Sequence, residues 1–161
     1  MNFLEHGDPR MSKLYESQFV MAVADSLRRA GFELPEQIPP YYEVIKGSPQ
    51  SEAEGVIFLD TATIILEIEK KPFPSDTVVK YHRALALGLL RPPIKGGRLI
   101  LVHAFITRHI RPLRVENAKY MGELLRKDHG AFYISAESED EDIPFLVSEI
   151  EPQLVHCLAR K

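Results

Sequence analysis

Two glutamates and two lysines close the most apolar run in the middle of the chain. Residues 63–71 read Thr-Ile-Ile-Leu-Glu-Ile-Glu-Lys-Lys. Successive side chains of a β-strand point to opposite faces, so Glu67, Glu69 and Lys71 share one face, about 7 Å apart at each step. The apolar residues between them share the other face. The spacing therefore predicts a strand that presents two carboxylates and an ammonium group side by side.

A second strand-like run, residues 53–59, precedes this one and is separated from it by Asp60-Thr61-Ala62. So short a connection requires an antiparallel hairpin. If Asp60 and Thr61 form the tight turn, Glu54 lies directly opposite Glu67. A slip of one or two residues in that turn leaves Glu54 beside Glu67 or Glu69. The hairpin therefore brings three carboxylates to one patch.

A patch of this kind repels itself, because like charges directly opposed on a sheet destabilise it by up to about 1 kcal/mol per pair. A hard divalent cation offsets the repulsion, since Mg²⁺ or Mn²⁺ binds carboxylate oxygens and completes its shell with water and substrate phosphate oxygens. The cation then activates a water for attack on a phosphodiester, while a neighbouring carboxylate or lysine orients that water. The alternative is an exposed strand face on which the glutamates form ion pairs with Lys70, Lys71 and Lys80.

The two runs together, Glu54 to Leu59 and Ile65 to Lys71, resemble the signature of the PD-(D/E)XK, or restriction-endonuclease-like, nuclease superfamily. The resemblance extends to the order of elements from about Lys13 to Ser135. It implies a metal-dependent endonuclease that hydrolyses DNA phosphodiester bonds with Mg²⁺ or Mn²⁺. Cleavage of both strands of a duplex favours a two-fold homodimer. The alternative is a catalytically inactive nuclease-fold module that binds nucleic acid or a protein partner.

By this resemblance Glu54 takes the position of the first acidic metal ligand, which is usually Asp, and Glu67 that of the second. Glu69 then replaces the usual lysine as a further acidic ligand, as in the family's E-x-E variant, and Lys71 or Lys70 supplies the missing positive charge. A second register, with Glu69-Lys70-Lys71 as the E-x-K motif, uses the same strand face. The sequence leaves both registers open.

Two residues resemble the family's accessory groups more weakly. Glu16 lies in the first predicted helix, and Lys80 lies in the helix that follows the motif. For each of them a surface salt bridge is the alternative interpretation.

Charge is segregated along the chain, although the formal net charge is only −3. Residues 70–114 hold ten of the 20 lysines and arginines but one of the 23 acidic residues. Such an excess is the electrostatic footprint of a phosphate-backbone binder. The expected DNA-binding residues are Lys70, Lys80, Arg83, Arg91, Lys95, Arg108, Arg111 and Arg114. The acidic run 137–142 is interpreted as a solvated loop, with binding of a basic partner as the alternative.

Hydrophobic periodicity places these residues in one α/β domain, residues 1–161, with a restriction-endonuclease-like αβββαβ core and an additional C-terminal strand and helix. A mixed central sheet is flanked by helices. Helices are predicted over residues 11–30, 75–90, 115–128 and 145–158, the last broken or kinked at Pro152. Strands are predicted over residues 40–46, 53–59, 63–71, 99–106 and 131–135.

Composition and motifs exclude several other classes. With 45% apolar and 27% charged residues the chain is neither disordered nor fibrous. Its longest apolar stretch is shorter than the ~20 residues of a membrane-spanning helix, and residues 1–8 do not resemble a secretory signal. Cys157, the single cysteine, is predicted to be a buried thiol, consistent with a cytoplasmic protein. The six histidines lack zinc-ligand spacing, and His103 is predicted to be a satisfied core residue.

Overall fold

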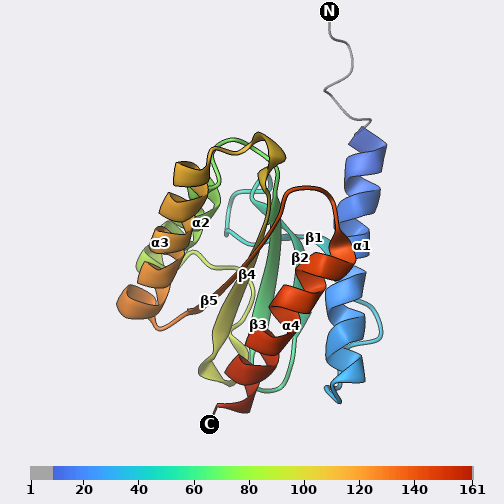
Figure 1. Ribbon diagram of the computed structural model, residues 1–161. Helices are drawn as coiled ribbons and strands as arrows, with labels where there is room; N and C mark the ends of the chain where they lie inside the picture. Colours follow the sequence, from blue (N-terminus) through green and yellow to red (C-terminus); the bar gives the residue numbers. More distant parts are fainter. Residues whose placement is uncertain (1–8, 161) are drawn as a thin grey trace, which may run out of the picture.

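The computed structural model describes residues 9–160, so the prediction about a secretory signal in residues 1–8 lies outside the described part. Helices and strands follow the order predicted from the sequence (Figure 1). They are α1 (Pro9–Arg29), β1 (Pro40–Glu43), β2 (Glu52–Phe58), β3 (Thr63–Glu69), α2 (Ser75–Leu87), β4 (Leu99–Ile106), α3 (Pro112–His129), β5 (Phe132–Ser138) and α4 (Ile143–Ala159). Short 3₁₀ turns precede and follow β4, at Lys95–Gly97 and Thr107–His109.

The five strands form one mixed sheet in the order β1-β2-β3-β4-β5. The first three strands are an antiparallel meander, whereas β3, β4 and β5 run parallel to one another. Parallel neighbours need a crossover connection, and α2 and α3 supply the two that this sheet requires. The hairpin between β2 and β3 has the predicted register, with Gly55 opposite Leu66 and Val56 opposite Ile65. Glu54 and Glu67 are the next positions outward.

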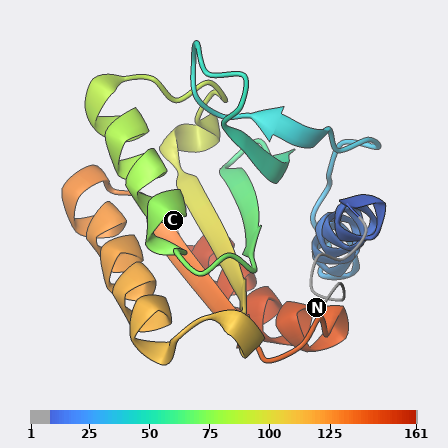
Figure 2. The same cartoon turned by 90° about the horizontal axis from the view of Figure 1, so that it is seen from above.

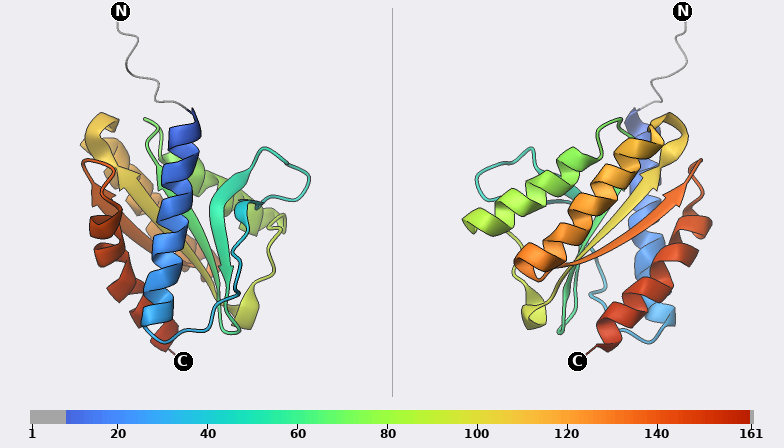
Figure 3. Two further views of the ribbon diagram at one scale, coloured as in Figure 1. Left: turned by 90° about the vertical axis from the view of Figure 1, so that its right-hand side faces the viewer. Right: turned by 60° about the vertical axis from the view of Figure 1, so that its left-hand side comes forward.

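Helices cover both faces of the sheet, which makes a mixed α/β structure of three layers (Figure 2). One apolar core joins α1 and α4 to the face that carries Leu66, Val102 and Ile134. The other core joins α2 and α3 to the face that carries Ile65 and Leu101. In Figure 3, α2 and α3 lie side by side on one face, and α1 crosses the other. No helix of residues 9–160 combines the length and the apolar character needed to cross a bilayer.

Four element boundaries differ from the prediction by three residues, and β3 ends at Glu69, so Lys71 follows the strand and is not part of its face. Strand β1 ends at Glu43, three residues early, and Ile45 forms only an isolated bridge with Leu90. Helix α2 ends at Leu87, because Gly88 adopts a left-handed φ of 65° that caps it. Strand β5 continues to Ser138, because it pairs with β4 as far as Ile106. Helix α3 begins at Pro112, whose fixed φ suits a first helical position.

Of the predicted break or kink of the last helix at Pro152, the break is wrong. Helix α4 is continuous from Ile143 to Ala159 with Pro152 inside it. Proline removes one helical N–H donor, but Ile150 and Leu154 on either side are buried against the sheet. Gln153 Nε2 also donates to the Glu149 carbonyl at 2.9 Å. Tertiary packing therefore holds the helix through the proline.

Candidate active site

The carboxyl-terminal end of β3 opens into a cleft of about 660 Å³. Its walls come from α1, the start of β2, the end of β3, the loop Lys70–Pro74 and the first turns of α2. The cleft contains every predicted catalytic and accessory residue, namely Glu16, Glu54, Glu67, Glu69, Lys70, Lys71 and Lys80. The fold thus brings together residues that the sequence distributes over 65 positions, from the first helix to the helix after the motif.

The side chain of Glu54 bridges β2 and β3 beyond the last paired residues of the two strands. The paired register ends at Gly55 and Leu66, and beyond it the Ile68 backbone N–H donates to Glu54 Oε2 at 2.9 Å. Burial raises the pKa of Glu54 well above its usual range, and the negative charge of Glu67 raises it further. Without a cation, the structure therefore favours a proton on this carboxyl group.

Glu67 is 5% exposed and accepts two hydrogen bonds from α2 at the same oxygen. Lys80 Nζ donates to Oε1 at 2.9 Å, and the buried Tyr81 hydroxyl also donates to Oε1. The ion pair between Lys80 and Glu67 agrees with one part of the alternative interpretation, in which the glutamates pair with nearby lysines. The strand face is not exposed, however, because α2 covers it, and the alternative of an exposed strand face is wrong.

Glu69 has the opposite electrostatic environment to Glu54. Burial works to raise its pKa, but the His103 ring and the Thr77 hydroxyl lower it overall. Thr77 Oγ1 donates to Glu69 Oε2 at 2.6 Å. His103 Nε2 lies 4.0 Å from the same oxygen, too far for a direct hydrogen bond. Glu69 is therefore ionised at neutral pH.

His103 lies fully buried in the middle of β4, as predicted, but only one of its nitrogens is satisfied. Its Nδ1 is 3.0 Å from the Tyr133 hydroxyl of β5. Its Nε2 has no hydrogen-bond partner among residues 13–160, and the nearest acidic group is the Glu69 carboxylate. The prediction of a satisfied core histidine is therefore correct for one ring nitrogen and wrong for the other.

Glu16 reaches the cleft because α1 packs unusually close to β2. A Cβ on Gly55 would lie 2.7 Å from Val20 Cγ1, so only glycine permits this approach without a shift. One helical turn before Val20, Glu16 Oε2 accepts a hydrogen bond from the Tyr41 hydroxyl at 3.0 Å. The charge of Glu16 also contributes to the raised pKa of Glu54.

The lysines that follow β3 have different surroundings. Lys71 is exposed at the mouth of the cleft. Lys70 forms an ion pair with Glu141 and lies over the Tyr15 ring, 4.7 Å from its centroid. Of the two candidates for the missing positive charge, Lys71 is the one without a carboxylate partner among residues 13–160.

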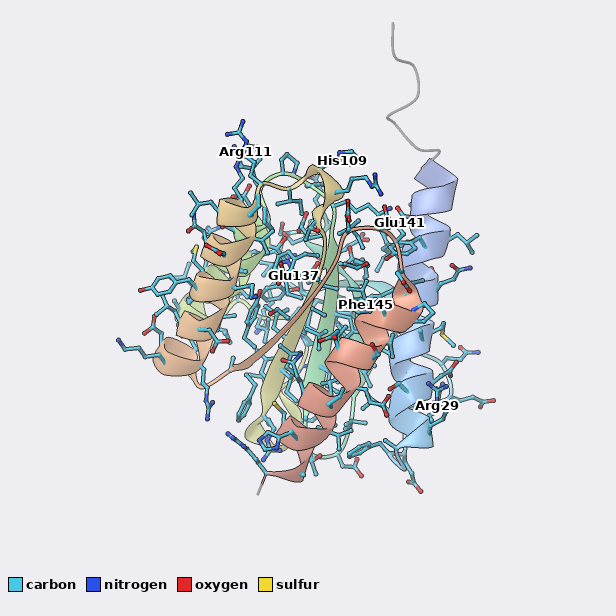
Figure 4. All side chains as sticks on the ribbon, viewed as in Figure 1. Arg29, His109, Arg111, Glu137, Glu141 and Phe145 are labelled. Atoms are coloured by element: carbon cyan, nitrogen blue, oxygen red, sulfur yellow. The ribbon has the colours of Figure 1, made fainter. Side chains whose placement is uncertain are left out.

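Five of the eight predicted DNA-binding residues lie at one end of the sheet, and the other three lie elsewhere. Lys70, Lys80, Arg108, Arg111 and Arg114 lie around the end of the sheet where β3 and β4 finish, and Figure 4 shows Arg111 at that end with Glu141. Lys95 lies at the opposite end, where its backbone N–H donates to Thr63 Oγ1. Arg91 pairs with Glu43 of β1, and Arg83 lines a smaller neighbouring hollow on α2. The eight predicted residues therefore do not form one continuous basic strip.

The acidic run 137–142 is largely exposed, but Glu137 and Ser138 belong to β5, and only the residues after them form the predicted loop. The acidic side chains are also not free of partners. Glu137 pairs with Lys119, Asp140 with Arg108, and Glu141 with Lys70. Exposed pairs of this kind contribute little stability, ~0–1 kcal/mol each. Their effect is electrostatic, because they neutralise part of the basic excess beside the cleft.

Three polar residues of the site were not recognised from the sequence as partners of the glutamates or of His103. They are Thr77 and Tyr81 on α2 and Tyr133 on β5. A signal for the first two exists, because Thr77, Lys80 and Tyr81 recur at helical spacing on one face of α2. No local pattern indicates Tyr133, whose contact with His103 depends on the pairing of β4 with β5.

The donor chemistry of the cleft fits a hard divalent cation. Its lining holds six carboxylates against three ammonium groups, and carboxylate oxygens are the ligands that Mg²⁺ and Mn²⁺ prefer. Glu54 and Glu67 repel each other, and such a cation would neutralise their negative charge. In their present positions, no three His, Cys, Asp or Glu side chains of the described chain form a ready-made metal site. Each of the three central carboxylates instead accepts a hydrogen bond from a protein donor.

Comparisons of the chain with protein-family models, with curated proteins and with solved structures found no match.

Proposed function

We propose that the protein is a metal-dependent endonuclease with a restriction-endonuclease-like core, which hydrolyses DNA phosphodiester bonds with Mg²⁺ or Mn²⁺. The observation that carries this proposal is the carboxylate pair of Glu54 and Glu67, on adjacent strands in register, beside Glu69 in one cleft. The α-β-β-β-α-β order with a mixed sheet is also the order that the resemblance implies. Because Glu54 lies beside Glu67, the geometry supports the E-x-E register.

Glu54 and Glu67 would hold the cation, with Glu69 completing the acidic set. When bound, the cation supplies an activated water and neutralises charge on the phosphodiester. Lys80 and Tyr81 fix the position of Glu67 through Oε1. Glu69 is ionised and oriented by Thr77, so as the neighbouring carboxylate it would orient the attacking water. Lys71 at the open mouth would contact a phosphate oxygen.

DNA would approach the end of the sheet that carries Lys71, Arg111 and Arg114. Lys70 and Arg108 would exchange their acidic partners for phosphates as the strand binds. Double-strand cleavage would require two copies related by two-fold symmetry. Sedimentation with and without a DNA duplex measures whether a homodimer forms.

A second candidate is a catalytically inactive module of the same fold that binds nucleic acid or a protein partner. The observation in its favour is that each central carboxylate already has a protein donor, namely the Ile68 N–H, Lys80 or Thr77. Such a network can hold the cleft together without a cation. The two candidates differ in whether phosphodiester bonds break.

Nicking of supercoiled plasmid with Mg²⁺, with Mn²⁺ and with EDTA tests the proposal. We expect cleavage only with the divalent cations, and a loss of more than about 100-fold in Glu67→Gln, beyond what outer-shell partners usually cost. Glu52→Gln is the matched control, because Glu52 lines the same cleft but is exposed and changes charge equally. Equal cleavage by both variants would contradict the proposal. A crystal soaked in Mn²⁺ should show the ion on Glu54 and Glu67.

A further inference from the structure

Phe73 is an exposed aromatic residue at the mouth of the cleft. It is 56% exposed, and it lines the cleft beside Lys71 and Thr77. Single exposed apolar residues are common on protein surfaces, so exposure alone indicates nothing. What distinguishes Phe73 is its position beside the carboxylate cluster and the contacts that hold it there.

Three contacts fix the segment that carries this ring. The Arg114 guanidinium lies over the ring, 4.2 Å from its centroid. Arg114 Nη1 donates to the Pro72 carbonyl at 3.0 Å, and the Asp76 N–H donates to the Phe73 carbonyl at 3.2 Å. Prolines on both sides, Pro72 and Pro74, further restrict the backbone. The ring is therefore preorganised, although it packs into neither apolar core.

The other aromatic rings near the carboxylates are already engaged. Tyr81 is buried and bonded to Glu67, and Tyr41 is bonded to Glu16. Tyr15 is buried beneath Lys70. Of the aromatic side chains in residues 13–160, Phe73 is the one that lines the cleft, and the Arg114 guanidinium lies over its ring.

We propose that Phe73 is a stacking platform for an unpaired base of the DNA strand whose phosphate enters the cleft. The inference rests on the proposed function and names its substrate class, which is DNA with single-stranded character at the cleavage point. In an intact duplex each base is stacked on both sides and offers no free face, whereas an unpaired base can stack on an aromatic side chain. Arg114 would contribute a cation–π contact to the stack and attract the flanking phosphate.

The chain contains no tryptophan, so Phe73→Trp creates a single fluorescent reporter at this position. The probe is a phosphorothioate-linked oligodeoxythymidine, which resists hydrolysis, titrated with Mg²⁺ present to neutralise the cleft. We expect the Trp emission to be quenched by this single strand and not by a blunt duplex of the same length. Phe145→Trp is the matched control, because Phe145 is 46% exposed at the start of α4, on the opposite face of the sheet (Figure 4).

Anisotropy of a labelled single strand gives the affinities independently of emission. We expect Phe73→Ala to weaken binding about 5- to 150-fold, the range measured for loss of one base–aromatic stack, and Phe73→Tyr to bind as the unmodified chain does. Binding without quenching, equal quenching by the duplex, or no binding by the single strand would each overturn the platform. None of these outcomes depends on cleavage. Quenching by the single strand without cleavage of an unmodified single strand in Mg²⁺ would instead count against the nuclease and leave the platform standing.

Discussion

The two faces of the sheet differ most at the carboxyl-terminal ends of β3 and β4. Toward α1 and α4 the strands present Leu66, Ile68, Val102 and Ala104, all buried and apolar. Toward α2 and α3, the same stretch presents the polar side chains of Glu67, Glu69 and His103, which are as well buried. Burying a polar group costs free energy unless it finds partners. The face toward α1 and α4 therefore contributes stability. The face toward α2 and α3 contributes less, because it holds charged groups beside a cleft.

The largest expected effect on stability is on the apolar face. Leu66 is fully buried next to Glu67 in sequence. We expect Leu66→Ala to lower the free energy of unfolding by about 2–5 kcal/mol, because it removes buried methyl groups and leaves a cavity. Urea unfolding measures this loss. The cleavage rate per folded molecule should stay unchanged, and a decrease as large as that of Glu67→Gln would show that the two faces are not separable.

A smaller effect is expected when a polar partner is removed from the other face. Tyr81→Phe deletes the buried hydroxyl that donates to Glu67, and a hydrogen bond to a charged group contributes about 1.5–3 kcal/mol. Urea unfolding at neutral pH measures the change. Tyr42→Phe is the control, because the Tyr42 ring packs on Phe58 and its hydroxyl bonds to no described residue. Equal losses in the two variants would mean that the hydroxyl of Tyr81 is dispensable.

The dependence of stability on pH sharpens the comparison within the polar face. Because the pKa of Glu54 is raised on folding, the folded state binds more protons than the unfolded chain above the ordinary glutamate pKa. Stability should therefore decrease as pH rises from there to the folded pKa of Glu54, by at most about 1.4 kcal/mol per pH unit. Glu54→Gln should remove the decrease. Urea unfolding in EDTA over this range measures it, and a slope that survives in Glu54→Gln would assign it to another group.

Glu69 provides the opposite control. Its pKa is lowered on folding, so it contributes stability above the ordinary glutamate pKa and loses it as pH falls through the folded value. We expect Glu69→Gln to be less stable than the unmodified chain at neutral pH and to approach it in acid. The same series of unfolding curves tests this expectation. A constant difference at all pH values would contradict it.

Much of the fold was predictable because it depends on local periodicity. The register of β2 and β3 follows from a short turn between two alternating runs, since a slip of one residue would turn the apolar side chains to the wrong face. Two of the differences, at Pro152 and at the end of β5, arise where tertiary contacts outweigh local preference. Pro152 stays helical because its neighbours are buried, and β5 is extended by its pairing with β4.

The sequence by itself determined which carboxylates share one strand face and that Glu54 lies beside them, because alternation and turn length are properties of a few adjacent residues. Only the tertiary structure decided the partners of these charges. Lys80 pairs with Glu67 across 13 positions, whereas Lys70 pairs with Glu141 across 71. Such pairs depend on how helices and loops pack against the sheet, and no spacing in the chain encodes that packing locally.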